Sequence, residues 1–170
     1  MATEIERKFL IKDDSWRDAV IDETRLVQGY LVSQPGLTLR VRIAGGQALL
    51  TLKGATRGIS RAEYEYPIPL ADAEAMLATL AVGPTIEKTR YRVRHGAQVW
   101  EVDIFDGANA GLALAEIELG EPDEPFEHPA WAGAEVSDDP RYYNANLVRH
   151  PFRDWDQSSS PEAHNSFAPS

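Results

Sequence analysis

The 170-residue chain is long enough to form one domain with a hydrophobic core, and we expect that domain to span residues 1–155. It contains no cysteine, which excludes a disulfide scaffold and thiolate metal ligands. A net charge of −10 argues against a protein that coats nucleic acid, because such proteins need a basic face. The charged start of the chain does not resemble a signal peptide, and no apolar run has the length of a membrane span. We therefore expect a cytoplasmic protein without a membrane partner.

Apolar and polar residues alternate along most of the chain, and this period of two predicts β-strands. In chain order the sequence predicts a strand at 3–11, a turn at 15–20, strands at 24–33, 37–44, 47–53 and 58–67, a helix at 72–80, strands at 86–95, 97–105 and 112–120, and a helix at 139–148. Asp72 is the expected N-cap of the first helix, and Pro140 suits the first helical position of the second. Gly45-Gly46 can supply the positive φ angle of a two-residue hairpin. The polar residues 156–170 lack periodicity, and we expect a disordered tail there.

The expected fold is mainly β, of the α+β class, because eight predicted strands are accompanied by few helices. Short turns between most of the strands favour an antiparallel sheet that closes on itself. Eight strands make a barrel whose interior is just wide enough for side chains or for one small ligand. The sequence therefore predicts an eight-stranded antiparallel closed β-barrel with flanking helices.

Charged residues occupy alternate positions in seven of these strands, so each set projects to one side of its strand. In chain order they are Glu4, Glu6 and Lys8; Arg40 and Arg42; Lys53; Glu63 and Glu65; Lys88, Arg90 and Arg92; Glu101 and Asp103; Glu116 and Glu118. A solvated sheet face would explain any one strand. A charged interior explains the set better, because like charges at i and i+2 repel unless neighbouring strands carry the opposite sign. The pattern alone leaves both interpretations open.

The residue types themselves indicate phosphoryl chemistry. Paired carboxylates are hard oxygen ligands of the kind that Mg²⁺ and Mn²⁺ prefer. Paired arginines with lysines offer forked and point-charge donors to phosphate oxygens. Together these groups can position a phosphate chain and neutralise its charge, which is most of what phosphoryl transfer requires. The chain has no P-loop motif, and its four histidines do not cluster, so neither a P-loop enzyme nor a histidine-based site is supported.

The start of the chain, Glu4-Ile5-Glu6-Arg7-Lys8, resembles the Glu-x-Glu-x-Lys signature of the CYTH superfamily, the triphosphate tunnel metalloenzymes. The resemblance runs from residue 3 to about residue 148 and shows no departure at a core position. The further matching segments, in the family's order and spacing, are Gln28-Gly29-Tyr30-Leu31, Leu39-Arg40-Val41-Arg42, Thr51-Leu52-Lys53-Gly54, Glu63-Tyr64-Glu65, Glu87-Lys88-Thr89-Arg90-Tyr91, Trp100-Glu101-Val102-Asp103, Ala115-Glu116-Ile117-Glu118-Leu119, Glu135-Val136-Ser137-Asp138 and Arg141-Tyr142-Tyr143-Asn144.

This resemblance implies that the barrel is a tunnel that binds a linear triphosphate together with Mg²⁺ or Mn²⁺. The implied metal ligands are Glu4, Glu6, Asp103, Glu116 and Glu118. The implied substrate-binding residues are Lys8, Arg40, Arg42, Lys53, Lys88 and Arg90, with Arg92 added because it shares their strand face. The candidate catalytic residues are Glu4, Glu6, Lys8, Glu63, Glu65, Glu116 and Glu118. Glu63 and Glu65 are expected to orient the basic side chains, with a direct metal role left open.

Among the activities of this family, the sequence favours hydrolysis of inorganic tripolyphosphate to pyrophosphate and phosphate. The chain has short loops and no insertion that could build a pocket for a nucleobase or a thiazolium ring. Class IV adenylate cyclase and thiamine triphosphatase remain the alternatives, and a non-catalytic polyphosphate-binding module is disfavoured because binding alone would not need the glutamate pairs. The expected partner is a small anionic substrate, not nucleic acid, and a homodimer is left open.

Overall fold

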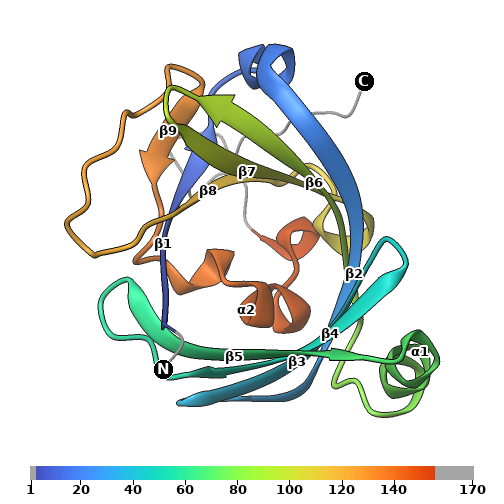
Figure 1. The fold of residues 1–170 in the computed structure, drawn as a ribbon. Coiled ribbons are helices and arrows are strands. Elements are labelled where there is room, and N and C mark those ends of the chain that lie inside the picture. The colour runs from blue at the N-terminus through green and yellow to red at the C-terminus, as the bar shows by residue number, and fades with distance from the viewer. Residues whose placement is uncertain (1–2, 156–170) are drawn as a thin grey trace.

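Strands make up most of residues 3–155, the part of the chain that the computed structural model describes (Figure 1). The strands are β1 (Thr3–Ile11), β2 (Val20–Gln34), β3 (Leu37–Ala44), β4 (Gln47–Gly54), β5 (Ser60–Ile68), β6 (Ile86–His95), β7 (Gln98–Phe105), β8 (Ala113–Glu118) and β9 (Ala132–Glu135). The α-helices are α1 (Leu70–Thr79) and α2 (Asn144–Arg149), and the 3₁₀ helices are η1 (Ser15–Ala19), η2 (Gly107–Asn109), η3 (Pro140–Tyr142) and η4 (Phe152–Asp154).

The sheet closes into a barrel because β1 pairs with two of its strands. The hydrogen-bonded order is β5-β4-β3-β2-β6-β7-β8-β1, and the first residues of β1 pair with β5. Every pairing is antiparallel. The second half of β1 also pairs with β9, which lies outside this ring of eight strands. The predicted eight-stranded antiparallel barrel is confirmed.

The apolar faces of the strands point away from the barrel interior and are covered from outside. Around β1, β7 and β8 the outer core includes Phe9, Trp16 of η1, Trp100 and Trp131. Around β3 and β4 the outer core is completed by Ala73 of α1. The interior is therefore left to the charged faces, which is the reverse of an ordinary small barrel.

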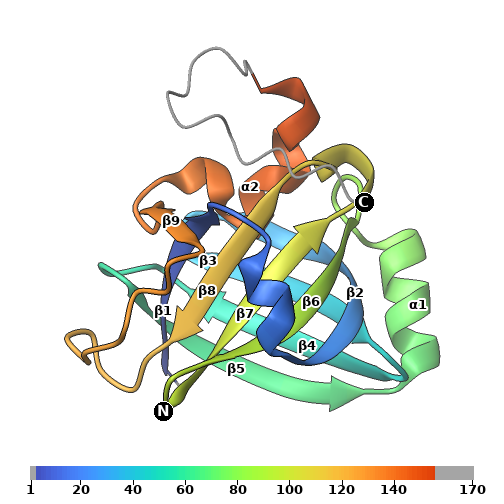
Figure 2. The same cartoon turned by 90° about the horizontal axis from the view of Figure 1, so that it is seen from above.

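One end of the barrel is filled by apolar side chains. Leu10, Ile86, Phe105 and Leu114 are the inward residues of β1, β6, β7 and β8 at this end, and they pack against the segment that includes Leu147 of α2. Seen along the barrel axis, α2 lies within the ring of strands (Figure 1), and the view turned by 90° places it at one end of the barrel (Figure 2). The C-terminal segment thus covers this end of the interior.

Several element boundaries differ from the sequence-based predictions. α1 begins at Leu70, with Pro69 instead of Asp72 as its N-cap. The second predicted helix is divided, because Tyr143 has an extended conformation between η3 and α2. β2 begins at Val20, four residues earlier than predicted, and β9 was not predicted. The hairpin at Gly45-Gly46 is present, with a φ of 62° at Gly45.

The expected disordered tail at 156–170 lies outside the described residues. Within residues 3–155, no helix combines the length and the apolar character needed to cross a membrane.

Candidate active site

Strand register gathers the predicted charged residues on the inner face of the barrel. Residues directly opposite each other in an antiparallel pair share a face, so their side chains are neighbours. The opposed charged pairs are Glu6 with Glu118, Lys8 with Glu116, Lys53 with Glu63, Arg90 with Asp103, Arg92 with Glu101, and Glu101 with Glu116. Four of these six pairs join opposite charges, and two join carboxylates.

The deepest part of this charged interior is centred on Asp103 of β7. Its carboxylate accepts two hydrogen bonds from Arg90, at 2.8 and 2.9 Å, and lies 2.7 Å from Nζ of Lys88. Burial alone would raise the pKa of Asp103, but Arg90 and Lys88 hold it well below its usual range. Burial lowers the pKa of Lys88 to about 8, against the opposing effect of Asp103. Asp103 therefore holds two buried cations in fixed positions.

The wall formed by β3, β4 and β5 carries a second set of paired charges. Nη2 of Arg40 lies 3.7 Å from Oε2 of Glu65, and the hydroxyl of Thr51 links the same two side chains. Nζ of Lys53 lies 2.5 Å from Glu4 and 3.4 Å from Glu63. Glu63 and Glu65 thus each hold a base, which is compatible with the orienting role expected for them.

Arg42, also on β3, is close enough to the cluster around Asp103 to interact electrostatically with Arg90 and Asp103. Its Nε donates a hydrogen bond of 2.8 Å to Oε1 of the buried Gln28. Burial, together with the nearby positive charges of Arg40 and Arg90, lowers the pKa of Arg42 to about 10. Three guanidinium groups that repel one another around one space favour the entry of an anion.

The C-terminal segment contributes polar groups to the buried lysines. Nζ of Lys8 donates a hydrogen bond of 3.1 Å to the carbonyl oxygen of Tyr142 and lies 3.7 Å from Glu116. Nζ of Lys88 donates one of 3.1 Å to Oδ1 of Asn144. The sequence contained a signal for these contacts, because both residues belong to a matching family segment, but no role was assigned to them.

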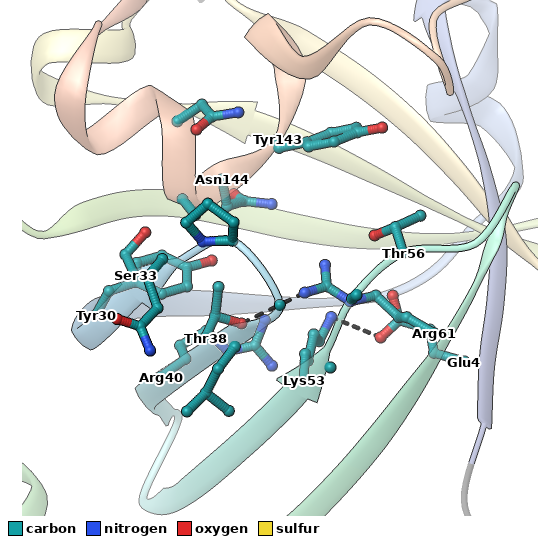
Figure 3. A pocket seen from close by; sticks show the side chains of 18 of the residues that line it. Glu4, Tyr30, Ser33, Thr38, Arg40, Lys53, Thr56, Arg61, Tyr143 and Asn144 are labelled. Atoms are coloured by element: carbon teal, nitrogen blue, oxygen red, sulfur yellow. Dashed lines mark hydrogen bonds and ion pairs between the residues drawn. The ribbon is translucent and has the colours of Figure 1, made fainter.

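A cavity of about 300 Å³ lies between α2 and the wall of β3, β4 and β5. Of the predicted site residues it is lined by Glu4, Glu6, Lys8, Arg40 and Lys53. Figure 3 shows Arg40, Lys53 and Glu4 on one side of the cavity and Tyr143 and Asn144 on the other.

Two residues depart from the predicted set. Arg61 of β5 also lines the cavity and was not predicted as a site residue. Arg92, predicted as substrate-binding, lies apart from the cluster: its side chain is 49% exposed and pairs with Asp22 at 2.8 Å. Its strand face is the expected one, but its position is near the solvated part of the barrel.

Four of the five expected metal ligands, Glu4, Glu6, Glu116 and Glu118, come from the neighbouring strands β1 and β8. Among residues 3–155, no group of three or more acids or histidines is arranged to hold a metal ion as it stands. One reason is that Glu4 is turned toward Lys53 and Glu116 toward Lys8.

The same carboxylates nevertheless suit a divalent cation. Burial raises the pKa of Glu118, and the negative charges of Glu4 and Glu101 raise it further. Burial and the charge of Glu6 likewise raise the pKa of Glu116. These crowded carboxylates repel one another, and a hard cation would relieve that repulsion. The donor set therefore fits Mg²⁺ or Mn²⁺.

Nearly the whole chain is similar to known proteins. The family model of the CYTH domain matches residues 2–147. The chain is 42% identical over 155 residues to the inorganic triphosphatase of Acetivibrio thermocellus, across 91% of this chain and 99% of the relative. It is 39% identical over 150 residues to the inorganic triphosphatase of Nitrosomonas europaea, across 86% and 97%. The crystal structure of the inorganic triphosphatase NE1496 has a TM-score of 0.63 at 37% identity and covers 87% of this chain and 95% of its own.

Proposed function

Because this chain belongs to the CYTH domain family, we propose that it is an inorganic triphosphatase that hydrolyses linear tripolyphosphate to pyrophosphate and phosphate. Its two relatives of that name each align over more than nine-tenths of their own length, so the similarity extends to the whole barrel. We place the activity in the cytoplasm and expect no nucleic-acid partner, since the net charge is −10. A homodimer is compatible with this activity.

The observation that carries the proposal is a cavity in which bases on several strands converge. Lys8, Arg40 and Lys53 line it from β1, β3 and β4, and Arg42 lies on the same face of β3 as Arg40. A linear triphosphate carries several negative charges along its length, so bases spread over several strands bind it better than a single phosphate. Each base is held in advance by a carboxylate or an amide, which lowers the cost of ordering it when substrate binds.

In the proposed reaction, water attacks a terminal phosphorus, the adjacent bridging P–O bond breaks, and pyrophosphate leaves with the electron pair. Arg40, Arg42 and Lys53 bind the phosphate oxygens and stabilise the charge that builds up on the leaving group. Asp103 keeps Lys88 and Arg90 oriented and favours their charged forms. Mg²⁺ or Mn²⁺, held by Glu4, Glu6, Glu116 and Glu118, would act as a Lewis acid and lower the pKa of a bound water.

The experiment is a product assay of the purified protein with Mg²⁺ and with Mn²⁺. Tripolyphosphate, pyrophosphate, ATP and thiamine triphosphate are compared for release of orthophosphate, and the ATP reaction is also analysed for cyclic AMP. We expect tripolyphosphate to be hydrolysed much faster than pyrophosphate, and ATP to give phosphate slowly. Cyclic AMP as the main product would replace the proposal with a cyclase, and equal rates on pyrophosphate would contradict the argument from several converging bases.

A further inference from the structure

Arg61 is a cavity residue that the roles assigned so far do not include. On β5 it shares the inner face with Glu63 and Glu65, because successive odd-numbered residues of a strand point to the same side. In the register it lies directly opposite Glu4 of β1. Figure 3 shows its side chain beside Lys53, Thr38 and Glu4.

What distinguishes Arg61 from neighbouring bases is the lack of a counter-charge. Lys8, Arg40 and Lys53 each lie within 4.0 Å of a carboxylate oxygen. Within residues 3–155, Arg61 forms no ion pair, and its side chain makes one long hydrogen bond of 3.5 Å to Oγ1 of Thr38. Its guanidinium is therefore the least neutralised of these four cavity bases.

The Nε group of Arg61 is also buried without a hydrogen-bond partner in the described part of the chain, and so is Nε of Arg40. A buried N–H that lacks an acceptor is unfavourable and rare. Two such donors beside one cavity, both from guanidinium groups, indicate that a negatively charged hydrogen-bond acceptor is missing.

The register gives Arg61 a defined place along the wall. The residues that face the interior form rows across β3, β4 and β5. The first row is Arg40, Thr51 and Glu65, and the second row contains Lys53 and Glu63. Arg61 is the next residue of β5 after Glu63 that faces the interior. Each such step is about 6.8 Å along a strand. A phosphate chain bound to the first two rows must extend beyond them to reach Arg61.

We propose that Arg61 binds the third phosphate of the substrate and gives the site its preference for three linked phosphates over two. This inference rests on the proposed function, since it assumes that a linear triphosphate occupies the cavity. A diphosphate bound at Arg40 and Lys53 gains little from Arg61, whereas a triphosphate supplies the acceptor that its guanidinium lacks.

The test is equilibrium binding of tripolyphosphate and of pyrophosphate to the metal-free protein in EDTA, measured by titration calorimetry. Arg61→Ala should weaken tripolyphosphate binding about tenfold or more and pyrophosphate binding less than about threefold. Arg57→Ala is the matched control, because Arg57 is an exposed arginine of the β4–β5 connection, close to Arg61 in sequence, that does not line the cavity. It should change both affinities less than about twofold.

Arg61→Lys keeps the charge without the fork and should give an intermediate loss for tripolyphosphate. If Arg61→Ala melts at a lower temperature than the wild type, the affinities of Arg61→Lys for the two anions decide the role of Arg61. In kinetics with metal, Arg61→Ala should raise KM for tripolyphosphate and leave kcat near the wild-type value.

Equal losses for both anions, or losses no larger than those of Arg57→Ala, would overturn the role of Arg61. These outcomes are separate from a failure of the proposed function. If the wild type does not hydrolyse tripolyphosphate but Arg61→Ala still loses affinity for it selectively, the activity is wrong and the binding role of Arg61 stands. If the wild type is active and Arg61→Ala matches the control, the activity stands and the role of Arg61 is wrong.

Discussion

Asp103→Asn tests whether the buried cations of the barrel depend on one carboxylate. Asp103 is fully buried and receives hydrogen bonds from both Arg90 and Lys88. Asparagine keeps the size of the side chain, but it removes the negative charge and replaces one acceptor oxygen with a donor amide. The variant would therefore hold two buried cations without their shared counter-charge.

The expected cost follows from that burial. Removing one partner of a buried ion pair costs about 3–5 kcal/mol, because the other charge remains buried and unpaired. For a chain of this size each kcal/mol lowers the melting temperature by about 2–4 °C, so Asp103→Asn should melt about 6–20 °C below the wild type. Added tripolyphosphate should recover part of this loss, since it brings negative charge into the same interior.

Thermal melts with and without tripolyphosphate provide the measurement, and Asp22→Asn provides the control. Asp22 also pairs with an arginine at 2.8 Å, but both side chains are about half exposed, and such pairs contribute about 0–1 kcal/mol. Asp103→Asn could instead melt at the same temperature as the control and need more Mg²⁺ or Mn²⁺ for activity. In that case Asp103 is a metal ligand, as the family resemblance implies, and its pairing with Lys88 and Arg90 is secondary.

Three further predictions address substrate, metal and pH. Arg40→Ala removes one guanidinium fork from the cavity wall, so KM for tripolyphosphate should rise about tenfold or more relative to Arg57→Ala, and an unchanged KM would contradict its binding role. EDTA should abolish hydrolysis, and Mg²⁺ or Mn²⁺ should restore it better than the larger Ca²⁺; full activity in chelator would exclude a metal role. Glu135, whose pKa is lowered by its hydrogen bonds from Arg7, stabilises the fold only while it is ionised. Glu135→Gln should thus reduce the free energy of unfolding by less than about 1 kcal/mol at neutral pH. Urea titrations should show the difference shrink as pH falls below the ordinary glutamate pKa of about 4.3 and vanish once Glu135 is protonated in the folded protein.

Much of the barrel could be predicted from the sequence, because the alternation of apolar and charged residues continues through each strand. The strand at 3–11 and the strand at 86–95 match β1 and β6 at both ends. β9 was missed because its four residues, AGAE, carry no β-branched or aromatic side chain. Its strand conformation depends on pairing with Phe9 and Ile11 of β1, which is a tertiary contact that local sequence does not encode.

The inner face of the barrel could also be predicted, but its pairing could not. Alternation shows that Lys88 and Arg90 share a face, whereas their contact with Asp103 depends on the register of β6 against β7. The closure of β1 against β5, which places Arg61 opposite Glu4, joins strands far apart in the sequence. A signal for Arg61 did exist, since it precedes Glu63 by two residues on the same face of the predicted strand 58–67, but no role was assigned to it.

The pairing of acids with bases also implies that metal and substrate affect each other's binding. Lys53 holds Glu4, one of the expected metal ligands, at 2.5 Å. A phosphate that binds Lys53 leaves the carboxylate of Glu4 free to bind a cation, so the two ligands should bind cooperatively.

Lys53→Met releases Glu4 in the same way without any anion. The affinity of this variant for Mn²⁺, measured by calorimetry, should exceed that of the wild type. The gain should be larger than that of Arg57→Ala, which also removes one positive charge but frees no carboxylate of the site. Weaker or unchanged Mn²⁺ binding by Lys53→Met would mean that Glu4 does not alternate between the lysine and the metal.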